Sequence, residues 1–457
     1  MGFFVALVRL FGTNGIRGIP GKDLQPELIV KIGHAVSARL GKKIAIGRDG
    51  RISSPMISEL LSASLLESGS DVYDTGMLPT PALQFYTGRK KFDGSVMVTA
   101  SHNPPEFNGI KVVGSTGVEV SRQVEKEIEA LVFAEAKLEK NNLATGELIS
   151  VSDAIDVYLN GITSHVDIEK IKAKKFKVVI DAGNGMQALA APKLMEELGC
   201  TAICINCEVD GNFPARGSEP IPEKLTELAK EVRGLHADFG VAFDGDGDRA
   251  VFCDEKGTIQ TGDKSGALLA YYVLSAKDKI VTTIATSNLI DWVAEKKNAK
   301  LIRTKVGSVD VTDMMINTKA KAGFEENGGF FFAPHQPVRD GAMTLALMLN
   351  ALAEWKMKFS EVMAELPVFY QRKGNLSCPE ELKDQILSRI LNVADGTPDT
   401  TDGVKISYPD GSWVLVRPSG TEPIIRIFAE SSLEARAEEL YKKYITIVND
   451  FINKKEE

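Results

Sequence analysis

The sequence KKIAIGRDGRISSPMISELLSASLLESG, residues 42–69, joins a short apolar run to a glycine-rich turn and then to an amphipathic segment. The apolar run is typical of a buried strand, and Pro55 fits the first turn of a helix. Ser53 or Ser54 would cap that helix and Gly69 would end it. The stretch therefore predicts one strand, one loop and one helix in succession.

The same pattern returns twice along the chain. KFKVVIDAGNG at 175–185 and DKIVTTIATSN at 278–288 each pass from an apolar, β-branched run into a polar or glycine-rich turn that a helix follows. Units of this kind, spaced by about 100 to 130 residues, indicate successive α/β domains. We expect each domain to contain a mixed or parallel sheet with helices on its faces.

The last part of the chain has a different pattern. GVKISYPDGSWVLVRPSG, from residue 403, places an Asp-Gly turn between two alternating segments, which predicts a β-hairpin. The segment LEARAEELYKKYITIVNDFI, residues 433–452, has the periodicity of one long amphipathic helix. A smaller α+β domain is expected from about residue 367.

Four domains follow from these patterns. The polar segment at 134–147 and the turn after Asp254 mark two further boundaries. The predicted domains are residues 1–148, 149–254, 255–366 and 367–457.

Charge and composition narrow the classes of partner. The 457-residue chain carries 54 basic and 62 acidic side chains, a formal net charge of −8. This balance provides no broad positive field, so we expect no nucleic-acid or membrane partner. The apolar run at residues 1–11 is too short to span a bilayer and predicts a buried first strand in a cytoplasmic protein. The composition does not determine the oligomeric state, and a homo-oligomer is possible.

A cluster of three cysteines lies at 200–207, in CTAICINC. The spacing suggests a metal site, but no second cluster accompanies it and the run alternates with alanine and isoleucine as a strand does. Free cysteine is among the most buried residue types. We therefore expect Cys200, Cys204 and Cys207 to be core residues.

The segment GVAFDGDGDRAVF, residues 240–252, contains alternating aspartates between two strand-like runs. Side chains at i, i+2 and i+4 of an extended chain share one side, and the intervening glycines let the backbone curve. Carboxylates this close require a cation, and oxygen ligands suit Mg²⁺ or Ca²⁺. Asp244, Asp246 and Asp248 are therefore predicted metal ligands.

Two other motifs compete for this segment. An EF-hand loop would use the three aspartates and Glu255, but it needs glycine where the chain has Arg249. It also needs helices on both sides, where the sequence predicts strands. An aspartyl-phosphate phosphatase would use Asp244 as its nucleophile, but that motif expects threonine or valine at Asp248.

Two segments suit a sugar phosphate. RPSGTEPIIR at 417–426 offers two guanidinium groups, two hydroxyl groups and a glycine turn, which together can bind a phosphate. GFEENGGFFF at 323–332 groups acidic and amide side chains that suit sugar hydroxyls, although an ordinary turn is the default interpretation.

A serine and a histidine adjoin in DGSVMVTASHNPPEFNGIK, residues 93–111. The run 95–99 predicts a strand, and the two prolines prevent a helix from following it directly. Ser101 would therefore lie at the exit of a strand, where a nucleophile can be exposed. Adjacent residues on a strand point to opposite faces, so His102 is expected to be poorly placed to act on Ser101.

Taken together, six segments resemble the α-D-phosphohexomutases, which include phosphoglucomutase, phosphomannomutase and phosphoglucosamine mutase. They occur in the family's order and are spread over nearly the whole chain. They are FGTNGIRG (11–18), TASHNPPEFNGIK (99–111), DGDGDR (244–249), TKVGS (304–308), EENGG (325–329) and RPSGTEP (417–423). The resemblance implies four domains around a central cleft, three of them similar mixed α/β domains and the fourth smaller.

The resemblance also implies a role for individual residues. Ser101 matches the serine that carries a phosphoryl group, and Asp244, Asp246 and Asp248 match the ligands of Mg²⁺, with a serine phosphate oxygen completing the shell. Residues in motifs that line the cleft are Arg17, His102, Lys111, Arg249 and Lys305. Residues that match sugar and phosphate contacts are Glu325, Asn327, Arg417, Ser419, Gly420 and Thr421, and Arg426 joins them as part of the phosphate clamp.

The implied reaction interconverts hexose 1-phosphates and hexose 6-phosphates through phosphoserine 101 and a hexose 1,6-bisphosphate, which also serves as activator. The sugar loop EENGG differs from the form associated with bacterial phosphoglucosamine mutases and also from the Met-Ser form of some dual-specificity mutases. Glucose, mannose and glucosamine phosphates therefore all stay open, with glucose and mannose phosphates the preferred substrates and glucosamine phosphate the alternative.

The general base is the open part of this assignment. Gly329 stands where several family members have a histidine. His335 from the same loop is one replacement, and Lys111 or His102 are others if their pKa values lie near the working pH.

Overall fold

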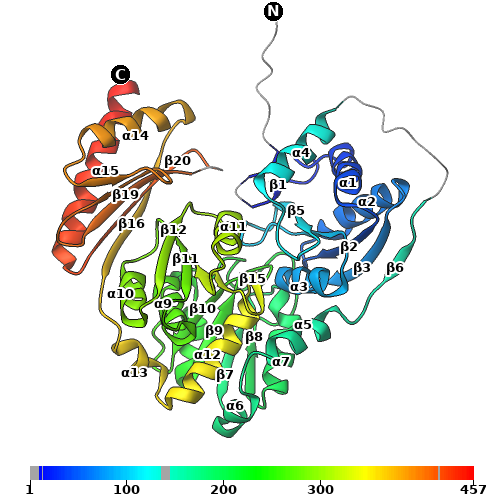
Figure 1. The fold of residues 1–457 in the computed structure, drawn as a ribbon, viewed down its shortest axis with the longest axis horizontal. Coiled ribbons are helices and arrows are strands. Elements are labelled where there is room, and N and C mark those ends of the chain that lie inside the picture. The colour runs from blue at the N-terminus through cyan, green and yellow to red at the C-terminus, as the bar shows by residue number, and fades with distance from the viewer. Residues whose placement is uncertain (1–9, 13, 135–144, 420–421, 457) are drawn as a thin grey trace, which may run out of the picture. The chain divides into compact units, whose positions relative to one another are not determined.

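The computed structural model describes residues 10–12, 14–134, 145–419 and 422–456 (Figure 1). The chain forms two compact units, which are described separately below. Unit 1 comprises Met1–Ser265 with Asn327–Val362, and unit 2 comprises Gly266–Glu326 with Met363–Glu457. Most of the first strand predicted at residues 1–11 lies outside the described residues.

Unit 1 begins with a six-stranded mixed sheet in the order β1-β5-β4-β2-β3-β6. Its strands are β1 (Ile16–Gly18), β2 (Lys43–Arg48), β3 (Asp71–Met77), β4 (Gly94–Val98), β5 (Asn108–Gly114) and β6 (Leu148–Ser150). Its helices are α1 (Pro26–Leu40), α2 (Ser54–Glu67), α3 (Thr80–Lys90) and α4 (Arg122–Phe133). Apolar side chains of α1, α2 and α4 pack on one face of the sheet in a single core, and α3 lies on the other (Figure 1).

The strand and helix predicted at 42–69 are confirmed as β2 and α2. The predicted cap is wrong in detail: Ser53 precedes the helix but makes no capping bond through its side chain. Ser53 Oγ instead accepts a hydrogen bond from Asn108, and Ser54 Oγ donates one to Asp49. These serines therefore connect the helix start to the loops at the strand ends.

The second sheet of unit 1 has four strands in the order β10-β9-β7-β8. They are β7 (Lys177–Asp181), β8 (Thr201–Ile205), β9 (Phe239–Phe243) and β10 (Ala250–Asp254). The accompanying helices are α5 (Ala154–Thr163), α6 (Ile168–Lys174), α7 (Ala191–Glu197) and α8 (Thr226–Gly234), with the 3₁₀ turns η1 (Met186–Leu189) and η2 (Pro222–Lys224). Strand β7 is parallel to β8 and β9, and β9 is antiparallel to β10.

The predicted core role of the cysteine cluster is wrong. Strand β8 is an edge strand; Cys204 is exposed, and Cys200 and Cys207 are partly exposed. Ile203 and Ile205 pack against the core of this sheet, and alternation along the strand sends Cys204 to the opposite side. The run therefore forms a strand as expected, but only one of its faces is covered.

Three parallel strands form the first part of unit 2, with β11 (Lys279–Thr283) between β12 (Lys300–Thr304) and β13 (Ala322–Phe324). Helix α10 (Leu289–Lys297) follows β11 as predicted, and α11 (Ser308–Thr318) follows β12. Helix α9 (Gly262–Val273) runs from unit 1 into unit 2, and α13 (Phe359–Ala364) also spans the two sequence ranges. An antiparallel pair, β14 (Phe330–Phe332) and β15 (Gln336–Arg339), and helix α12 (Gly341–Trp355) belong to unit 1.

An antiparallel sheet in the order β16-β20-β19-β18-β17 completes unit 2. Its strands are β16 (Tyr370–Ser377), β17 (Thr397–Asp399), β18 (Val404–Ser407), β19 (Trp413–Pro418) and β20 (Ile424–Ser431). The accompanying helices are η3 (Glu380–Leu382), α14 (Lys383–Asn392) and α15 (Glu434–Glu456). The predicted hairpin is confirmed as β18–β19, and the predicted long helix as α15.

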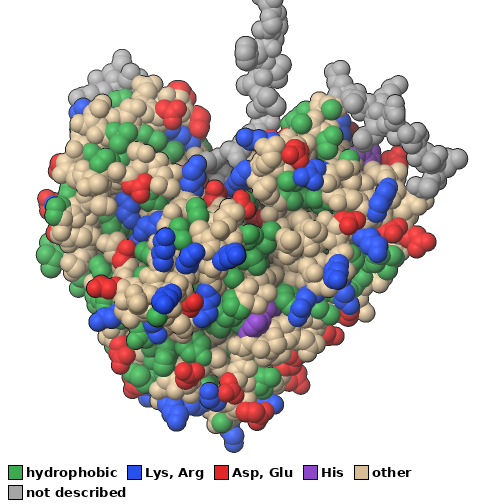
Figure 2. All heavy atoms as spheres, viewed as in Figure 1, with side chains coloured by type: hydrophobic (Ala, Val, Ile, Leu, Met, Phe, Trp, Pro, Cys, Tyr) green, Lys and Arg blue, Asp and Glu red, His purple; other side chains and the backbone are tan. Residues whose placement is uncertain are grey.

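The four-domain fold class is confirmed, with mixed sheets preceding an antiparallel C-terminal sheet. The boundaries proposed at 148, 254 and 366 stay predictions, and most of the polar segment at 134–147 lies outside the described residues. Among the described helices, none combines the length and the apolar character needed to cross a membrane. Acidic and basic side chains are interspersed over the face in Figure 2.

A buried lysine lies inside unit 2. Lys405 on β18 donates a hydrogen bond from Nζ to the Ile284 carbonyl at 3.0 Å, and the same atom lies 4.1 Å from the centre of the Trp413 ring. Burial, helped by the charge of Arg303, lowers the pKa of Lys405 to about 7. Between about pH 7 and the ordinary lysine pKa, the unfolded chain therefore binds more protons here than the folded chain.

We expect this difference to make unit 2 more stable as the pH rises from 7 to 9. Comparison of the wild type with Lys405→Met should show the wild type gaining about 2 kcal/mol in relative free energy of unfolding over that range. Denaturant unfolding at each pH measures it, with Lys230→Met on the exposed face of α8 as the control. A pH-independent difference between wild type and Lys405→Met would contradict the assignment.

Candidate active site

Ser101 lies in a turn directly after β4. Its backbone is left-handed, with φ of 51°, and its N–H donates to Thr99 Oγ1 at 2.9 Å. Ser101 Oγ lies 3.2 Å from Nδ1 of His102. The expectation that the two side chains point to opposite faces is wrong, because it assumed an extended backbone and the left-handed residue turns the chain.

A buried arginine determines the course of this turn. The Arg51 guanidinium is buried and donates to four carbonyl oxygens of the segment that follows β4. These are the carbonyls of Ser101, Asn103, Pro104 and Phe107, at 2.6–2.9 Å. Asp49 accepts from Arg51 Nε at 3.1 Å and from Thr99 Oγ1 at 2.6 Å. The ion pair of Asp49 and Arg51, both in the loop that connects β2 to α2, therefore organises the backbone around Ser101.

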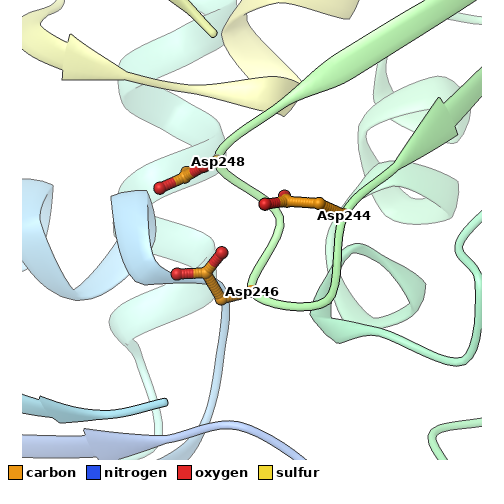
Figure 3. Close-up of side chains that lie close together, drawn as sticks. All are labelled: Asp244, Asp246 and Asp248. Carbon is orange, nitrogen blue, oxygen red and sulfur yellow. The ribbon is translucent and has the colours of Figure 1, made fainter. Parts of the chain in front are cut away.

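The three predicted metal ligands lie in the turn between β9 and β10, and their carboxyl groups face one another (Figure 3). One oxygen from each of Asp244, Asp246 and Asp248 lies within 4.8 Å of the others, and all three side chains are buried. Gly247, with φ of 77°, supplies the left-handed residue that the turn needs. Because the three side chains are buried, this is not an acidic turn exposed to solvent, and the flanking strands exclude the EF-hand.

The three carboxyl groups have different electrostatic surroundings, which shift the pKa values of Asp244 and Asp246 in opposite directions. Burial, together with the charges of Asp248 and Asp246, raises the pKa of Asp244 well above its usual value. Burial has the same tendency at Asp246, but the Lys111 ammonium at 2.8 Å outweighs it and lowers the pKa. Lys111 also lies 3.3 Å from Asp248, and its buried side chain keeps a raised pKa because of these carboxylates. Lys111 is therefore charged in this arrangement.

The chemistry of this donor set fits a hard divalent cation. Asp246 Oδ1 and Asp248 Oδ1 are buried and accept no hydrogen bond from the described part of the chain. Ser101 Oγ donates to Asp244 Oδ2 at 3.0 Å, so the serine adjoins the third carboxylate. Buried oxygens that lack donors and repel one another are the ligands that Mg²⁺ binds.

Cationic side chains surround the serine and the aspartates. Arg17 on β1 is partly buried and donates to Asn103 Oδ1. Desolvation of its guanidinium, together with the charges of Arg249 and Arg339, lowers the pKa of Arg17 to about 10. Arg249 Nε lies 3.8 Å from Asp244 Oδ2. Burial and these same arginines lower the pKa of His102 well below its ordinary value, so the imidazole is neutral. Of the predicted residues of unit 1, Arg17, His102, Lys111 and Arg249 therefore lie around Ser101 and the three aspartates.

Sequence reasoning missed two side chains that contact the aspartates. Arg339, the last residue of β15, donates from Nη2 to Asp248 Oδ2 at 2.7 Å. Thr80, the first residue of α3, donates to Asp246 Oδ2 at 2.7 Å. The signal available for Arg339 was its position in VRDGAM, immediately before an Asp-Gly pair and an apolar helix. No comparable signal marks Thr80.

The predicted sugar-contacting residues fall in both units. Glu325 is buried in unit 2 and accepts a hydrogen bond from the Gly307 N–H at 3.2 Å. Asn327 belongs to unit 1, and its Oδ1 accepts from the Gly329 N–H at 3.2 Å. Lys305 is exposed in unit 2.

The predicted phosphate clamp lies on β19 and β20 of unit 2. Arg417 and Arg426 are directly opposed in the antiparallel register, so their side chains share one face. Arg417 donates to Asp402 at 2.6 Å and Arg426 to Glu422 at 2.8 Å. Ser419 Oγ accepts from the Glu422 N–H at 3.2 Å. Gly420 and Thr421 lie outside the described residues.

Lys383 contacts this loop from another element, and the sequence did not reveal it. Its buried ammonium donates to the carbonyls of Ser419 and Glu422, at 2.8 and 3.0 Å, and so bridges the two ends of the loop. Its position at the start of α14 is distant in sequence from the loop, which explains why motif reasoning missed it.

The hypothesis that His335 replaces the missing histidine is wrong. Its ring is stacked on Phe85 with centroids 4.4 Å apart, and it lies near Tyr158 and His165. The side chain has no exposed surface, and Nε2 lies 3.4 Å from Asp340 Oδ2. An enclosed imidazole in this aromatic cluster cannot reach a substrate hydroxyl group.

Comparison with protein families matches four models along the chain. They are phosphoglucomutase/phosphomannomutase alpha/beta/alpha domain I at residues 8–139, domain II at 156–257, domain III at 261–370 and the C-terminal domain at 375–446.

Curated relatives match over nearly the full length. A phosphoglucosamine/phosphogalactosamine mutase of Sulfurisphaera tokodaii is 45% identical over 96% of this chain and 99% of its own. A phosphoglucomutase/phosphomannomutase of Thermococcus kodakarensis is 43% identical over 97% of this chain and 99% of its own. A solved structure of a phosphoglucomutase/phosphomannomutase family protein from Burkholderia thailandensis is 28% identical, with a TM-score of 0.84 over 96% of this chain and 97% of that chain.

Replacement of Arg51 tests whether its buried contacts hold the serine turn. Arg51→Lys keeps the charge but cannot reach all the carbonyls, and we expect it to cost about 3 kcal/mol in the free energy of unfolding. Hydrogen exchange should increase selectively at residues 101–107. Arg39→Lys, in an exposed ion pair with Glu127, is the control and should leave both measurements near wild type. Equal effects of the two substitutions would contradict this role.

Replacement of Asp244 tests whether the carboxylates repel one another when no metal is bound. In chelator, Asp244→Asn should melt at a higher temperature than wild type because it removes a buried carboxyl group whose charged form is disfavoured by burial and by the two neighbouring aspartates. Addition of Mg²⁺ should reverse the order, since only the wild type retains all three charged ligands. Thermal denaturation measures both states, with Asp156→Asn on the surface of α5 as the control. An Asp244→Asn variant that Mg²⁺ stabilises as much as wild type would refute the metal site.

Proposed function

The chain belongs to the phosphoglucomutase/phosphomannomutase family, the α-D-phosphohexomutases, and we propose that it interconverts hexose 1-phosphates and hexose 6-phosphates through a phosphorylated Ser101. Family membership makes the protein an intramolecular phosphotransferase, which replaces the alternatives of an aspartyl phosphatase and a calcium-binding module. The observation that carries the assignment of Ser101 is its hydroxyl, 3.0 Å from one carboxylate of a buried aspartate triad.

In the proposed reaction, a free hydroxyl group of the sugar attacks the phosphoserine phosphorus. The new oxygen–phosphorus bond forms as the bond to Ser101 Oγ breaks, and the proton lost by the sugar hydroxyl is balanced by the proton that Ser101 Oγ gains. The product is a hexose 1,6-bisphosphate, whose other phosphoryl group then returns to Ser101. Phosphate is neither gained nor lost over the cycle, so an added bisphosphate acts only as activator that phosphorylates the enzyme.

Residues near Ser101 would stabilise charge during transfer. Lys111, Arg17 and Arg249 carry positive charge beside the serine, and electrostatic stabilisation of this kind is the main contribution to phosphoryl transfer. A charged Lys111 supports a phosphate-binding role over that of a general base. His102 is neutral and lies 3.2 Å from Ser101 Oγ, so it is the candidate for holding or accepting the transferred proton.

Asp244, Asp246 and Asp248 would hold Mg²⁺. When bound, the ion would offset negative charge on the phosphoryl oxygens. The buried oxygens that lack hydrogen-bond donors support this assignment.

Residues of the sugar loop and of the clamp would bind the rest of the substrate. We assign Glu325 and Asn327 to sugar hydroxyls, Lys305 to the substrate phosphate, and the clamp residues Arg417, Ser419, Gly420, Thr421 and Arg426 to the phosphate that is not being transferred. The shared face of the two clamp arginines supports this assignment. Lys383 would keep the clamp loop in shape.

The identity of the sugar is proposed from the relatives. The relative at 45% identity is named for glucosamine and galactosamine phosphates, and the one at 43% for glucose and mannose phosphates. We therefore propose that glucosamine phosphate is a substrate together with the glucose and mannose phosphates that were preferred from the sequence. A cytoplasmic location stays a prediction.

A mutase assay on glucosamine, glucose and mannose 1-phosphates, with Mg²⁺ and glucose 1,6-bisphosphate, tests the proposal. We expect all three 6-phosphates to form, and Ser101→Ala to lower the rate by about a thousandfold or more because the phosphoryl carrier is lost. Ser388→Ala, on an exposed turn of α14, is the matched control. Failure to isomerise any of the three sugars would overturn the proposed substrates, and full activity of Ser101→Ala would overturn the role of Ser101.

A further inference from the structure

Gly329 and Arg339 lie against each other in the sugar loop and on β15. A Cβ atom built on Gly329 would meet Arg339 Cδ at 2.3 Å and Cγ at 2.9 Å, well inside van der Waals contact. Arg339 therefore occupies the space into which any other side chain at 329 would project. Building on the proposed function, we propose that Arg339 binds the phosphoryl group transferred at Ser101 and that Gly329 is required because it gives the arginine passage.

The destination of the Arg339 side chain supports this role. The side chain runs past Gly329, and its Nη2 lies 2.7 Å from Oδ2 of Asp248, one of the three aspartates near Ser101. The whole side chain is buried. A planar guanidinium can contact one carboxylate and one phosphate oxygen at the same time, which an ammonium group does less well.

The backbone that carries Arg339 is firmly held. The next residue, Asp340, caps α12 by accepting the Met343 N–H at 2.9 Å and also accepts from Tyr158 and from Gln336. The Gly341 N–H donates to the carbonyl of Gly247, inside the aspartate turn. The guanidinium is therefore delivered from a rigid junction, as precise binding of a reacting group requires.

The surrounding charges indicate an anion with several oxygens. Arg249 and Arg339 are buried and Arg17 is partly buried, and the first two lie near enough to Arg17 to lower its pKa. Nε of Arg17 and Nε of Arg249 are buried without a hydrogen-bond partner in the described structure. Buried guanidinium groups that repel one another and retain unused donors are stabilised by a dianion such as a phosphate ester.

Arg339 makes and breaks no covalent bond in this proposal. It stays protonated and neutralises charge on the phosphoryl oxygens while the oxygen–phosphorus bonds exchange. Gly329 contributes by its lack of a side chain alone. Its backbone lies outside the left-handed region, so alanine there is opposed by the severe contact with Arg339 and by a milder one, at 3.3 Å, with Asn327 Oδ1.

A double-mutant cycle with Gly329→Ala, Arg339→Gln and the double variant tests both parts. The first measurement is calorimetric titration of inorganic phosphate into the chelator-treated, dephosphorylated proteins. We expect Arg339→Gln to weaken phosphate binding by about tenfold or more and Gly329→Ala to weaken it by a smaller factor. The double variant should bind no more weakly than Arg339→Gln, because alanine at 329 has no arginine left to displace.

The same cycle is then measured in the mutase assay. Arg339→Gln should lower kcat more than it raises KM, and Arg339→Lys should recover part of the loss because it restores the charge. The controls are Gly234→Ala, where a Cβ meets no atom within 4 Å, and Arg389→Gln on an exposed position of α14. Melting temperatures identify any variant that fails to fold, and in that case the cycle is completed with Arg339→Lys.

Three results would overturn the proposal. Unchanged phosphate affinity in Arg339→Gln, with weaker Mg²⁺ binding only, would mean that the arginine merely orients Asp248. If the loss of phosphate affinity in the double variant equalled the product of the two single losses, positions 329 and 339 would act independently. Full mutase activity in Arg339→Gln would exclude contact with the transferred group. The phosphate titration does not depend on turnover, so a wild type that binds phosphate through Arg339 but isomerises no sugar would count against the proposed function alone.

Discussion

Three buried carboxylates in one six-residue turn are the constraint on which the rest of unit 1 depends. Asp244, Asp246 and Asp248 cannot all stay charged and buried unless positive charge compensates them. The chain supplies that charge from distant segments: Lys111 from β5 and Arg339 from β15 each contact an aspartate directly. The sheets around this turn consequently have to bring several strand ends to one place.

Placement of the serine follows from a second buried pair. Arg51 is bonded to Asp49 and to carbonyls on both sides of the two prolines, so the turn after β4 is held by main-chain contacts that do not depend on its own side chains. Ser218 adds a bond to the carbonyls of His102 and Asn103, and its own carbonyl accepts from the Gly245 N–H. The turn that carries Ser101 and the aspartate turn are thus joined through Ser218. Such rigid support is what a site needs if charge stabilisation is to contribute to the rate.

Prediction from sequence succeeded where a pattern is local. Strand β2, helix α2, the β18–β19 hairpin and helix α15 follow from periodicity and turn residues, and the aspartate turn follows from its spacing. Prediction failed where the backbone conformation or the neighbouring elements determine the position and exposure of a side chain. The left-handed backbone of Ser101 put His102 beside the hydroxyl, the uncovered face of the edge strand β8 exposed Cys204, and an aromatic cluster enclosed His335. None of these effects leaves a local signal in the residues concerned.

The sequence alone determined the family and the succession of α/β units before a final antiparallel sheet, and it marked Ser101 and the three aspartates as candidate site residues. These properties reside in short contiguous segments, so spacing and residue type suffice to find them. Tertiary structure decided which cations meet those aspartates, and it selected Arg339, Thr80 and Arg51, which motif reasoning had passed over. It also explained Gly329, whose missing side chain makes room for Arg339. The physical reason is that charge compensation and steric fit act through space, between residues that lie far apart along the chain.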